Sequence, residues 1–448
     1  MSVLRFKLCL LYFLQFAVWG CYLTSLGQFL GAGGLGADIA WFYAAIGMVS
    51  LVTPSLSGHI ADRFVSPEKL LGLFHLTAAL CMTGLWGYAT LNPEMEFAPA
   101  FTLYLLFLAF YMPTLALANT TAFKLLRNSG LRPVDEFPSI RVWGTVGFVI
   151  AMWFVNSAYF YDGSFGFTMS DSNPAAPYRF QYTPMQLLSS ASIGLVTSLY
   201  TLTLPHLREI KESNAEKASL SEIFGLKAFT LFKEKSLRTF LIFAIFIGVC
   251  LQISNGFATP FITHFMAIPE FAGSLAAGNA TMLFSLSQIS EAACVLLVGV
   301  TMKRLGFRWV IGIAMLAWTL RFLLFGFGDP GAGLWMLIAS MAVYGIAFNF
   351  FNIAGHIYME QSVPARHKGF GQGLLMMMSN GIGATFGTLG AGTVVNRFCH
   401  WETAANSAGG MSRFFMGDWE IPWLIFAAYS LAIGLLFILL YRNTSRPS

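Results

Sequence analysis

Long apolar runs separated by short polar stretches dominate the chain from end to end. A membrane-spanning helix needs about 20 mostly apolar residues, and the pattern predicts twelve such spans. In the first half they cover 8–30, 39–60, 69–90, 98–122, 139–160 and 186–204. In the second half they cover 237–265, 280–300, 308–327, 333–359, 370–394 and 421–441. The pattern therefore predicts an all-α integral membrane protein with twelve transmembrane helices.

One long charged segment divides these spans into six and six. We expect an N-terminal half over 1–204, a cytoplasmic linker over 205–236 and a C-terminal half over 237–448. Two parallel six-helix repeats are an arrangement that transporters use. A repeated loop motif supports this two-half arrangement. Gly58–Arg63 after the second span and Gly299–Arg308 after the eighth both resemble the loop motif of the major facilitator superfamily. We therefore predict the major facilitator fold.

Composition agrees with a membrane protein and excludes several other classes. The chain is 56% hydrophobic and 10% charged, with a mean hydropathy of +0.66, whereas soluble domains carry about 25% charged residues. Most of its apolar surface should therefore face lipid. The net charge of +5 is spread over short loops, and without a basic domain we expect no binding to nucleic acid.

Lysine and arginine residues gather in loops on one side of the predicted membrane. Arg141 and Arg321 lie inside predicted spans, and only Arg179, Arg397 and Arg413 fall in the opposite loops. Positively charged loops stay in the cytoplasm. We therefore expect a multi-pass protein of a bacterial inner membrane with both termini cytoplasmic.

An isolated acid marks one span as functional. Glu291 lies within the apolar run 282–299 with no charged residue beside it in sequence. An ionisable group in the middle of a membrane helix costs roughly 2.5–3.5 kcal/mol or more, and it usually faces a cavity where it handles an ion, a proton or a polar substrate. Glu291 is therefore the first candidate site residue.

Polar and aromatic side chains recur at helical spacing in other spans. Residues at i, i+3, i+4 and i+7 share a helix face, and in lipid a polar face must turn toward protein or a cavity. The stripes contain Gln15, Trp19 and Tyr22; Arg141, Thr145 and Phe148; Gly248, Gln252, Asn255 and Thr259; Ser285, Gln288 and Glu291; and Tyr344, Gly345, Phe348, Asn349, Asn352 and His356. Their amides, single acid and aromatic rings fit a neutral, hydrogen-bonding, ring-shaped solute, and an anionic substrate would need more positive charge.

Structural explanations compete with this functional one. Ser, Thr, Asn and Gln often join helices by hydrogen bonds, and an arginine can extend along its helix to reach water. For Arg141 such snorkelling and a substrate or acid contact stay equally open, and for Arg321 snorkelling or packing is our default. For Gln252 and Asn255 taken with Gln288 and Glu291 we favour a binding site, because a buried acid needs a functional reason.

Common enzyme motifs are either absent from this sequence or lack the structural context that they need. Gly31-Ala-Gly33-Gly-Leu-Gly36 matches the dinucleotide pattern, but it lies between two membrane spans with no strand before it. There is no P-loop, HExxH or GxSxG sequence, and the six cysteines have neither CxxC spacing nor a metal-ligand pattern. We expect no catalytic residues, no metal and no cofactor, so transport would have to use a gradient.

Several longer segments resemble the nucleoside–proton symporter family of the major facilitator superfamily almost from end to end. They are Phe13-Leu-Gln15-Phe-Ala-Val-Trp19-Gly20, Tyr111-Met-Pro113-Thr114, Phe137-Pro138-Ser-Ile-Arg141-Val-Trp143-Gly144-Thr145, Gln252-Ile-Ser-Asn255, Ser287-Gln288-Ile-Ser-Glu291, Arg321-Phe322 and Tyr344-Gly-Ile-Ala-Phe348-Asn349. The resemblance implies import of nucleosides by alternating access, coupled to protons. It places substrate contacts on Arg141, Thr145, Phe148, Gln252, Asn255, Gln288, Glu291, Tyr344 and Phe348.

The sequence departs from the family at one position of the implied proton pathway. The family has an aspartate where this chain has Asn349, and asparagine cannot titrate. Three interpretations stay open: Glu291 alone couples the proton, the protein is uncoupled or uses another ion, or the position was altered to stabilise one state.

We expect a monomer whose partners are a nucleoside, a proton and the surrounding lipid. The alternatives are an uncoupled nucleoside facilitator and a transporter of another neutral solute such as a sugar. A membrane enzyme is disfavoured because Glu291 has no acid–base partner near it in sequence. A nucleoside sensor is disfavoured because the sequence contains no soluble signalling domain.

Overall fold

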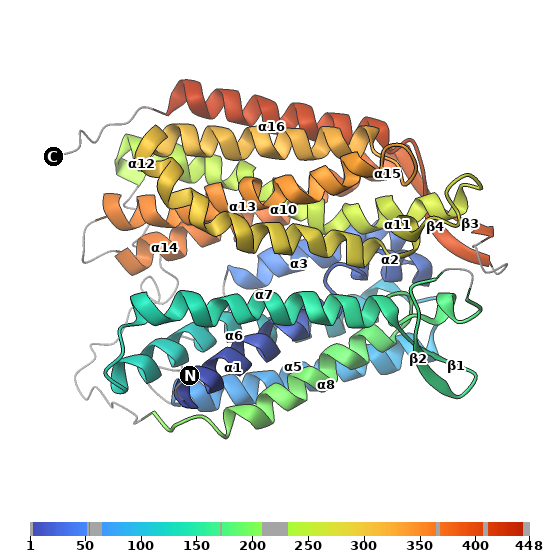
Figure 1. Ribbon diagram of the computed structural model, residues 1–448, viewed down its shortest axis with the longest axis horizontal. Helices are drawn as coiled ribbons and strands as arrows, with labels where there is room; N and C mark the ends of the chain where they lie inside the picture. The colour runs from blue at the N-terminus through green and yellow to red at the C-terminus, as the bar shows by residue number, and fades with distance from the viewer. Residues whose placement is uncertain are drawn as a thin grey trace. The chain divides into compact units, whose positions relative to one another are not determined.

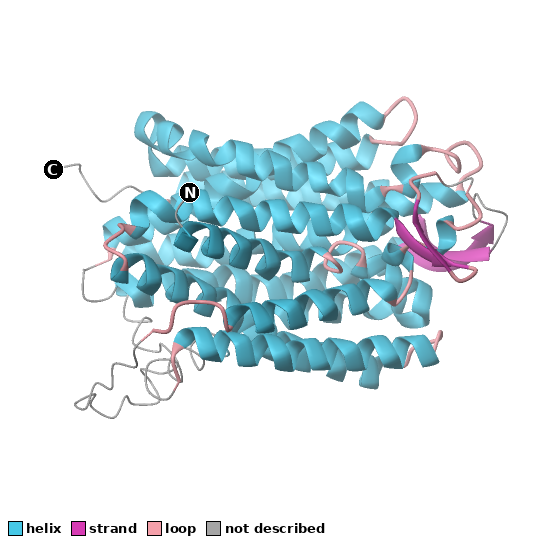
Figure 2. Cartoon of the chain, turned by 60° about the horizontal axis from the view of Figure 1, so that its bottom comes forward, coloured by secondary structure: helices cyan, strands magenta, loops and turns pink. Residues whose placement is uncertain are grey.

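The computed structural model describes residues 3–51, 53, 65–170, 173–207, 232–363, 368–405 and 411–441. Helices form nearly all of this part of the chain, with short strands at helix ends (Figure 1, Figure 2). Gly58–Arg63 and most of the predicted linker lie outside the described residues. The prediction of an all-α membrane protein is confirmed.

Membrane-spanning segments account for most of the helices. Among the described residues, nine helical segments are long and apolar enough to cross a membrane, which is consistent with the predicted twelve spans. The other predicted spans correspond to α8 (Met185–Thr201), to the first part of α12 (Ala280–Phe327), and to the run α14 (Lys368–Met376), η8 (Met377–Gly383) and α15 (Ala384–Phe398).

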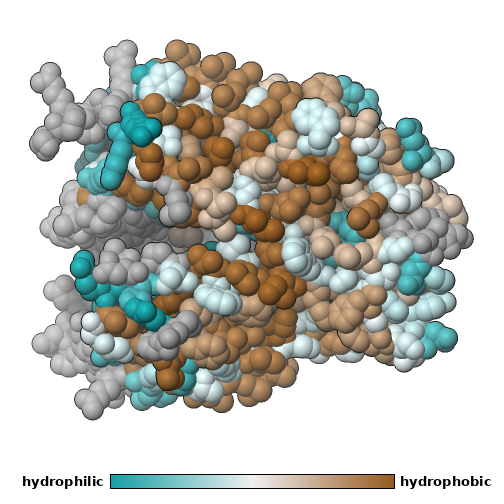
Figure 3. All heavy atoms as spheres, viewed as in Figure 1, coloured by the Kyte–Doolittle hydropathy of each residue, from teal (hydrophilic) through white to brown (hydrophobic). Residues whose placement is uncertain are grey.

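Apolar side chains cover the middle stretches of the helices on the face shown in Figure 3, and hydrophilic ones gather toward the helix ends. Large exposed side chains such as Leu80 and Leu439 are 63% and 69% accessible. Such exposure is costly in water and favourable in hydrocarbon. The surface therefore has the pattern expected of helices that face lipid.

The chain divides into two compact units. The first comprises Met1–Leu35 and Val49–Phe224, and the second comprises Gly36–Met48 and Gly225–Ser448. The first contains α1 (Val3–Gly20), α2 (Leu26–Leu30), α5 (Pro67–Leu91), α6 (Phe97–Asn128), α7 (Pro133–Ser157) and α8, with strands β1 (Ala158–Tyr161) and β2 (Ser164–Phe167). The second contains α3 (Ile39–Ser50, up to Met48), α10 (Lys235–His264), α11 (Leu275–Gly278), α12, α13 (Leu334–Ser362), α14, η8, α15, α16 (Glu420–Leu440), β3 (Cys399–Ala405) and β4 (Met411–Gly417).

Residues 36–48 pack with the second unit although they precede most of the first. The Asn396 amide donates to the Ala37 carbonyl at 3.0 Å. A Cβ on Gly47 would lie 2.6 Å from the Thr385 hydroxyl, so this helix approaches α15 closely. The sequence pattern assigned this span to the N-terminal half. Tertiary contacts, which that pattern does not contain, group it with the other unit.

Four predicted spans have different ends in the structure. The span 8–30 is broken by a turn over 21–25, and the span 139–160 is helical only to Ser157, where β1 follows. The spans 280–300 and 308–327 join in α12 through a sharp reversal at Gly306, whose φ is +76°. These residues are apolar or helix-compatible, so hydropathy alone does not locate the breaks.

The six cysteines form no disulfide, and four of them are buried. At the start of β3, outside the helices that span the membrane, burial raises the pKa of the Cys399 thiol to about 12. A thiol with such a pKa carries almost no nucleophilic thiolate at neutral pH. The interpretation of the cysteines as small buried hydrophobes therefore agrees with the structure.

Close backbone contact joins α1 to α7 in the first unit. A Cβ on Gly147 would lie 2.1 Å from the Phe13 carbonyl oxygen, and one on Gly20 would lie 2.4 Å from the Phe148 carbonyl oxygen. Membrane helices associate largely through such small-residue contacts, because lipid supplies no hydrophobic force between them. The contacts fix the register of α7, which carries three predicted site residues.

Replacing Gly147 with valine should separate these two helices. Overpacking typically costs about 1–3 kcal/mol, so we expect a clearly lower melting temperature of the purified protein in detergent. Gly87→Ala is the matched control, because no atom lies within 4 Å of a Cβ at that position. Equal melting of the two variants would contradict the proposed role of the close contact.

Candidate functional site

The acid predicted from sequence lies in the second unit where α12 meets α13. A Cβ on Gly345 would lie 2.3 Å from the Ser290 carbonyl oxygen, so the two helices touch through their backbones. The Tyr344 side chain of α13 interacts with Gln288 and lies in the field of the Glu291 carboxylate. The structure thus brings three predicted site residues together.

Two aromatic rings extend this group along α13. The Tyr344 and Phe348 rings are parallel within 3°, with centroids 5.7 Å apart. Trp318 of α12 meets Tyr344 edge-on, at a centroid distance of 5.8 Å and an angle of 89°. Tyr344 is buried and Phe348 is partly exposed, so the stack can offer an aromatic surface to a flat ligand.

Asn349 connects α13 to the backbone of the acid. Its side chain is 2% exposed, and its Nδ2 donates to the Glu291 carbonyl oxygen at 2.6 Å. An amide always has this donor, whereas a carboxyl group has it only when protonated. Asparagine therefore holds a contact that an aspartate could make only in its neutral form.

The two amides predicted on α10 differ in burial. Gln252 is 5% exposed, and its Oε1 has no hydrogen-bond partner among the residues that the structure describes. Asn255, three residues along the same face, is partly exposed. A buried polar atom without a partner costs about 1–3 kcal/mol. The Gln252 oxygen therefore keeps a free hydrogen-bond acceptor among the described residues, and its helix packs on both α12 and α13.

The remaining predicted residues belong to α7 in the first unit. Arg141, Thr145 and Phe148 follow one another on one helix face. The Arg141 guanidinium carbon lies 4.0 Å from the ring centroid of Phe16 on α1, a cation–π contact. The head group therefore lies against α1 and does not simply extend along its own helix.

Beside α7, a buried hydrogen-bond network joins α1, α5 and α6. The fully buried Gln15 donates to the Thr114 hydroxyl at 2.7 Å, and its Oε1 lies 2.7 Å from His75 Nε2. Since that oxygen can only accept, His75 carries its proton on Nε2. Tyr111 completes the network by donating to the Gln15 carbonyl at 2.7 Å. The sequence pattern did not single out His75, whose only signal was a lone histidine in an apolar span.

Arg321 is the second residue whose role the sequence did not reveal. It is fully buried, so of the two default interpretations snorkelling is wrong and packing agrees with the structure. The guanidinium donates to the Ser254 hydroxyl at 2.8 Å, the Ser287 hydroxyl at 3.2 Å and the Ser340 carbonyl at 2.6 Å. Its central carbon also lies 4.8 Å from the Tyr344 ring centroid. A positive charge therefore supports the ring that faces Glu291.

Lysine at position 321 should keep the charge and lose this geometry. An ammonium group lacks the planar fork that reaches several acceptors at fixed angles, and each buried group left unpaired costs about 1–3 kcal/mol. We expect Arg321→Lys to lower the melting temperature of the purified protein. The exposed Arg304→Lys variant is the control, and equal melting of both variants would refute the role of the fork.

Metal chemistry finds no support in this arrangement. Within the described ranges, no group of three His, Cys, Asp or Glu side chains could hold a metal ion. The second unit instead combines one carboxylate, several carboxamides, a buried arginine and an aromatic stack. Groups of these kinds are able to bind an uncharged ligand that has a flat ring and several hydroxyls, and a carboxylate can also bind a proton.

Comparisons with known proteins agree with this chemistry. Residues 1–446 match the family described as nucleoside H+ symporter. The nucleoside permease NupG of Escherichia coli K12 is 35% identical over 98% of this chain and 96% of its own length. The xanthosine permease of the same organism is also 35% identical, with the same coverage of both chains.

Solved structures extend the likeness to three dimensions. A crystal structure of a mutant of the nucleoside transporter NupG superposes with a TM-score of 0.84, at 34% identity and with 98% of this chain and 100% of that chain covered. A bacterial homologue of the lysosomal transporter Spinster reaches a TM-score of 0.67 at 13% identity, covering 98% and 96% of the two chains. The second comparison shows a shared fold alone.

Proposed function

The chain belongs to the nucleoside H+ symporter family and imports nucleosides with protons by alternating access, and we propose which residues bind the nucleoside and which one carries the proton. These relatives do not favour an uncoupled facilitator or a carrier of another neutral solute. One observation carries the assignment. The Tyr344 side chain interacts with Gln288 and lies in the field of the Glu291 carboxylate, and its ring is parallel to that of Phe348.

The nucleobase stacks on the aromatic surface of α13, and the sugar meets the polar groups. A base has a flat π-face that packs on Phe348 and Tyr344. Ribose hydroxyls both donate and accept, so they pair with the carboxylate of Glu291 and with the carboxamides. The amides assigned here are Gln252, Asn255 and Gln288, of which Gln252 has a buried oxygen without a partner.

We also propose that Arg141, Thr145 and Phe148 of the first unit contact the nucleoside, as the family resemblance implies. Arg141 and Thr145 offer hydrogen bonds, and Phe148 offers a second ring. The moving bodies are the halves predicted at 1–204 and 237–448, connected by 205–236, with residues 36–48 grouped with the second. Alternating access then exposes the ligand to each side of the membrane in turn.

Glu291 carries the proton. It is the only acidic residue on α10 and α12, and Asn349 cannot titrate. The carboxylate takes a proton from the outer, more acidic side as the nucleoside binds, and gives it up on the cytoplasmic side. Because the ionised form is costly in the low-dielectric interior, protonation also lowers the energy of the states through which the two units move.

We assign the cellular location, the membrane orientation and the oligomeric state from the sequence pattern. The protein is a multi-pass membrane transporter of a bacterial permease family. Its place is the inner membrane, with both termini cytoplasmic because the basic loops cluster on that side. We propose that it acts as a monomer within the lipid, without enzymatic activity of its own.

Glutamine at position 291 should separate binding from coupling. It keeps the shape and a hydrogen-bonding oxygen but binds no proton. In proteoliposomes with an inward proton gradient, the unchanged protein should accumulate labelled uridine, whereas Glu291→Gln should only equilibrate it at a rate independent of pH. The exposed Glu96→Gln variant is the control, and accumulation or pH dependence that survives in Glu291→Gln would exclude Glu291 as the carrier.

Aspartate at position 349 should add a second proton to the cycle. The hydrogen bond to the Glu291 carbonyl survives in Asn349→Asp only while the new carboxyl group is protonated. Uptake by this variant should therefore fall as the pH rises, more steeply than uptake by the unchanged protein. The measurement is the initial uptake rate between about pH 5 and 8, and superimposable pH profiles would show that position 349 takes no part.

A further inference from the structure

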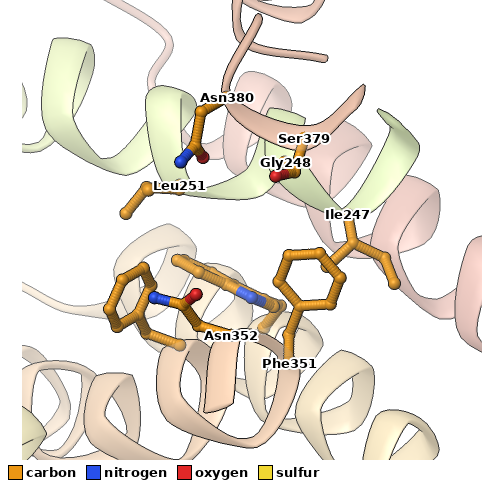
Figure 4. Close-up of a pocket in the computed structure, with 9 residues that line it drawn as sticks. Ile247, Gly248, Leu251, Phe351, Asn352, Ser379 and Asn380 are labelled. Atoms are coloured by element: carbon orange, nitrogen blue, oxygen red, sulfur yellow. The ribbon is translucent and has the colours of Figure 1, made fainter. Parts of the chain in front are cut away.

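A hollow lies beside the aromatic stack, entirely within the second unit (Figure 4). Its walls come from α10, α12, α13 and η8, and it encloses about 310 Å³ including the space at its mouth. Because that volume counts the open space at its mouth, the hollow offers room for the edge of a ligand and not for a whole one. Its lining residues are Ile247, Gly248, Leu251, Trp318, Phe348, Phe351, Asn352, Ser379 and Asn380.

Two carboxamides face each other across this hollow. Asn352 projects from α13 and Asn380 from η8, and Figure 4 shows both amides directed into the space between the helices. Neither side chain makes a hydrogen bond within the described part of the chain. The third polar residue, Ser379, already donates to the Leu375 carbonyl at 2.9 Å. Only the two amides thus keep their hydrogen-bonding capacity for a ligand.

The backbone around Asn380 is built in an unusual way. Met377–Gly383 forms a π-helix, and short π-helical segments occur frequently at functional sites. Gly248 lets α10 approach this segment, because a Cβ there would lie 2.2 Å from the Ser379 carbonyl oxygen. The wider turn and the close approach together bring Asn380 to the wall opposite Asn352.

The hollow is continuous with the nucleoside site assigned above. Phe348 lines the hollow and also stacks on Tyr344, and Trp318 lines it while meeting Tyr344 edge-on. Gln252, with its buried and unpartnered oxygen, follows the lining residue Leu251 in α10. A flat ring on Phe348 would therefore turn its edge toward the two asparagines.

We propose that the edge of the nucleobase enters this hollow and is read by Asn352 and Asn380. This inference rests on the proposed nucleoside site and adds the residues that recognise the base. Each carboxamide has a donor and an acceptor side by side, the arrangement with which asparagine pairs with the edge of adenine. Because an amide can rotate to exchange the two, the same pair also accepts a keto–imino edge, and the site takes both purines and pyrimidines.

The test compares two nucleosides that share a sugar and differ at the base edge. Purine riboside lacks the exocyclic group of adenosine, so it lacks one hydrogen-bonding partner for the asparagines. We measure how strongly each compound competes with labelled uridine for uptake into proteoliposomes. The unchanged protein should prefer adenosine by about five- to tenfold, the effect of one hydrogen bond. In Asn352→Leu and Asn380→Leu this preference should fall toward one.

Three further variants make the result specific. Gln288→Leu on the sugar side should weaken both competitors alike and keep their ratio. Asn396→Leu is the matched control, because that exposed amide bonds to the Ala37 carbonyl away from the hollow. Asn352→Ser replaces the leucine variant if the latter does not fold, since serine keeps a polar group but is too short to reach the base edge.

Each result separates the inference from the proposed function. If the unchanged protein transports uridine but does not prefer adenosine over purine riboside, the inference fails and the proposed function stands. The same holds if the asparagine variants weaken both compounds equally, because that is the effect of a merely structural role. If the unchanged protein takes up no nucleoside at all, the proposed function fails and the inference fails with it.

Discussion

The buried guanidinium group of Arg321, which has no access to water, holds helices of the second unit in register. Arg321 is fully buried among three helices and donates to two serine hydroxyls and a main-chain carbonyl. The hydrocarbon core of a membrane offers no hydrogen bonds in exchange, so these groups are satisfied only while α10, α12 and α13 hold one register. The Tyr344 ring rests on the same guanidinium, and the register therefore extends to the stack beside Glu291.

Close backbone approach serves the same purpose where no charge is available. At Gly345 the backbone of Ser290 comes close, at Gly248 that of η8, and at Gly147 that of α1. In lipid, helices gain little from hiding apolar side chains, so contact through small residues supplies much of their association. Gly345 and Gly147 each precede or follow a residue with a proposed role in binding, and Gly248 lies against Ser379, the residue before Asn380. The site is therefore positioned by contacts between backbones, which move less than long side chains do.

In the proposed function, the coupling chemistry concentrates on one carboxylate. The Asn349 amide never titrates and holds the backbone of Glu291 by a hydrogen bond. Position 349 therefore contributes geometry, and Glu291 contributes the charge. A neutral amide there makes the local structure independent of proton binding. In the proposed function, this separation of the structural hydrogen bond from the titrating group leaves Glu291 free to respond to both nucleoside and proton during alternating access.

The sequence by itself determined the membrane spans, the isolated acid and the amide and aromatic stripes, because hydropathy and helical periodicity are local properties of the chain. It did not locate the break after Gly20, and it did not show that residues 36–48 pack with the second unit, since apolar residues continue through both regions. Likewise, the sequence left both snorkelling and packing open for Arg321. Only the tertiary structure decided that it faces serines from other helices, because the partners of a buried charge are distant in sequence and become neighbours only when the helices pack.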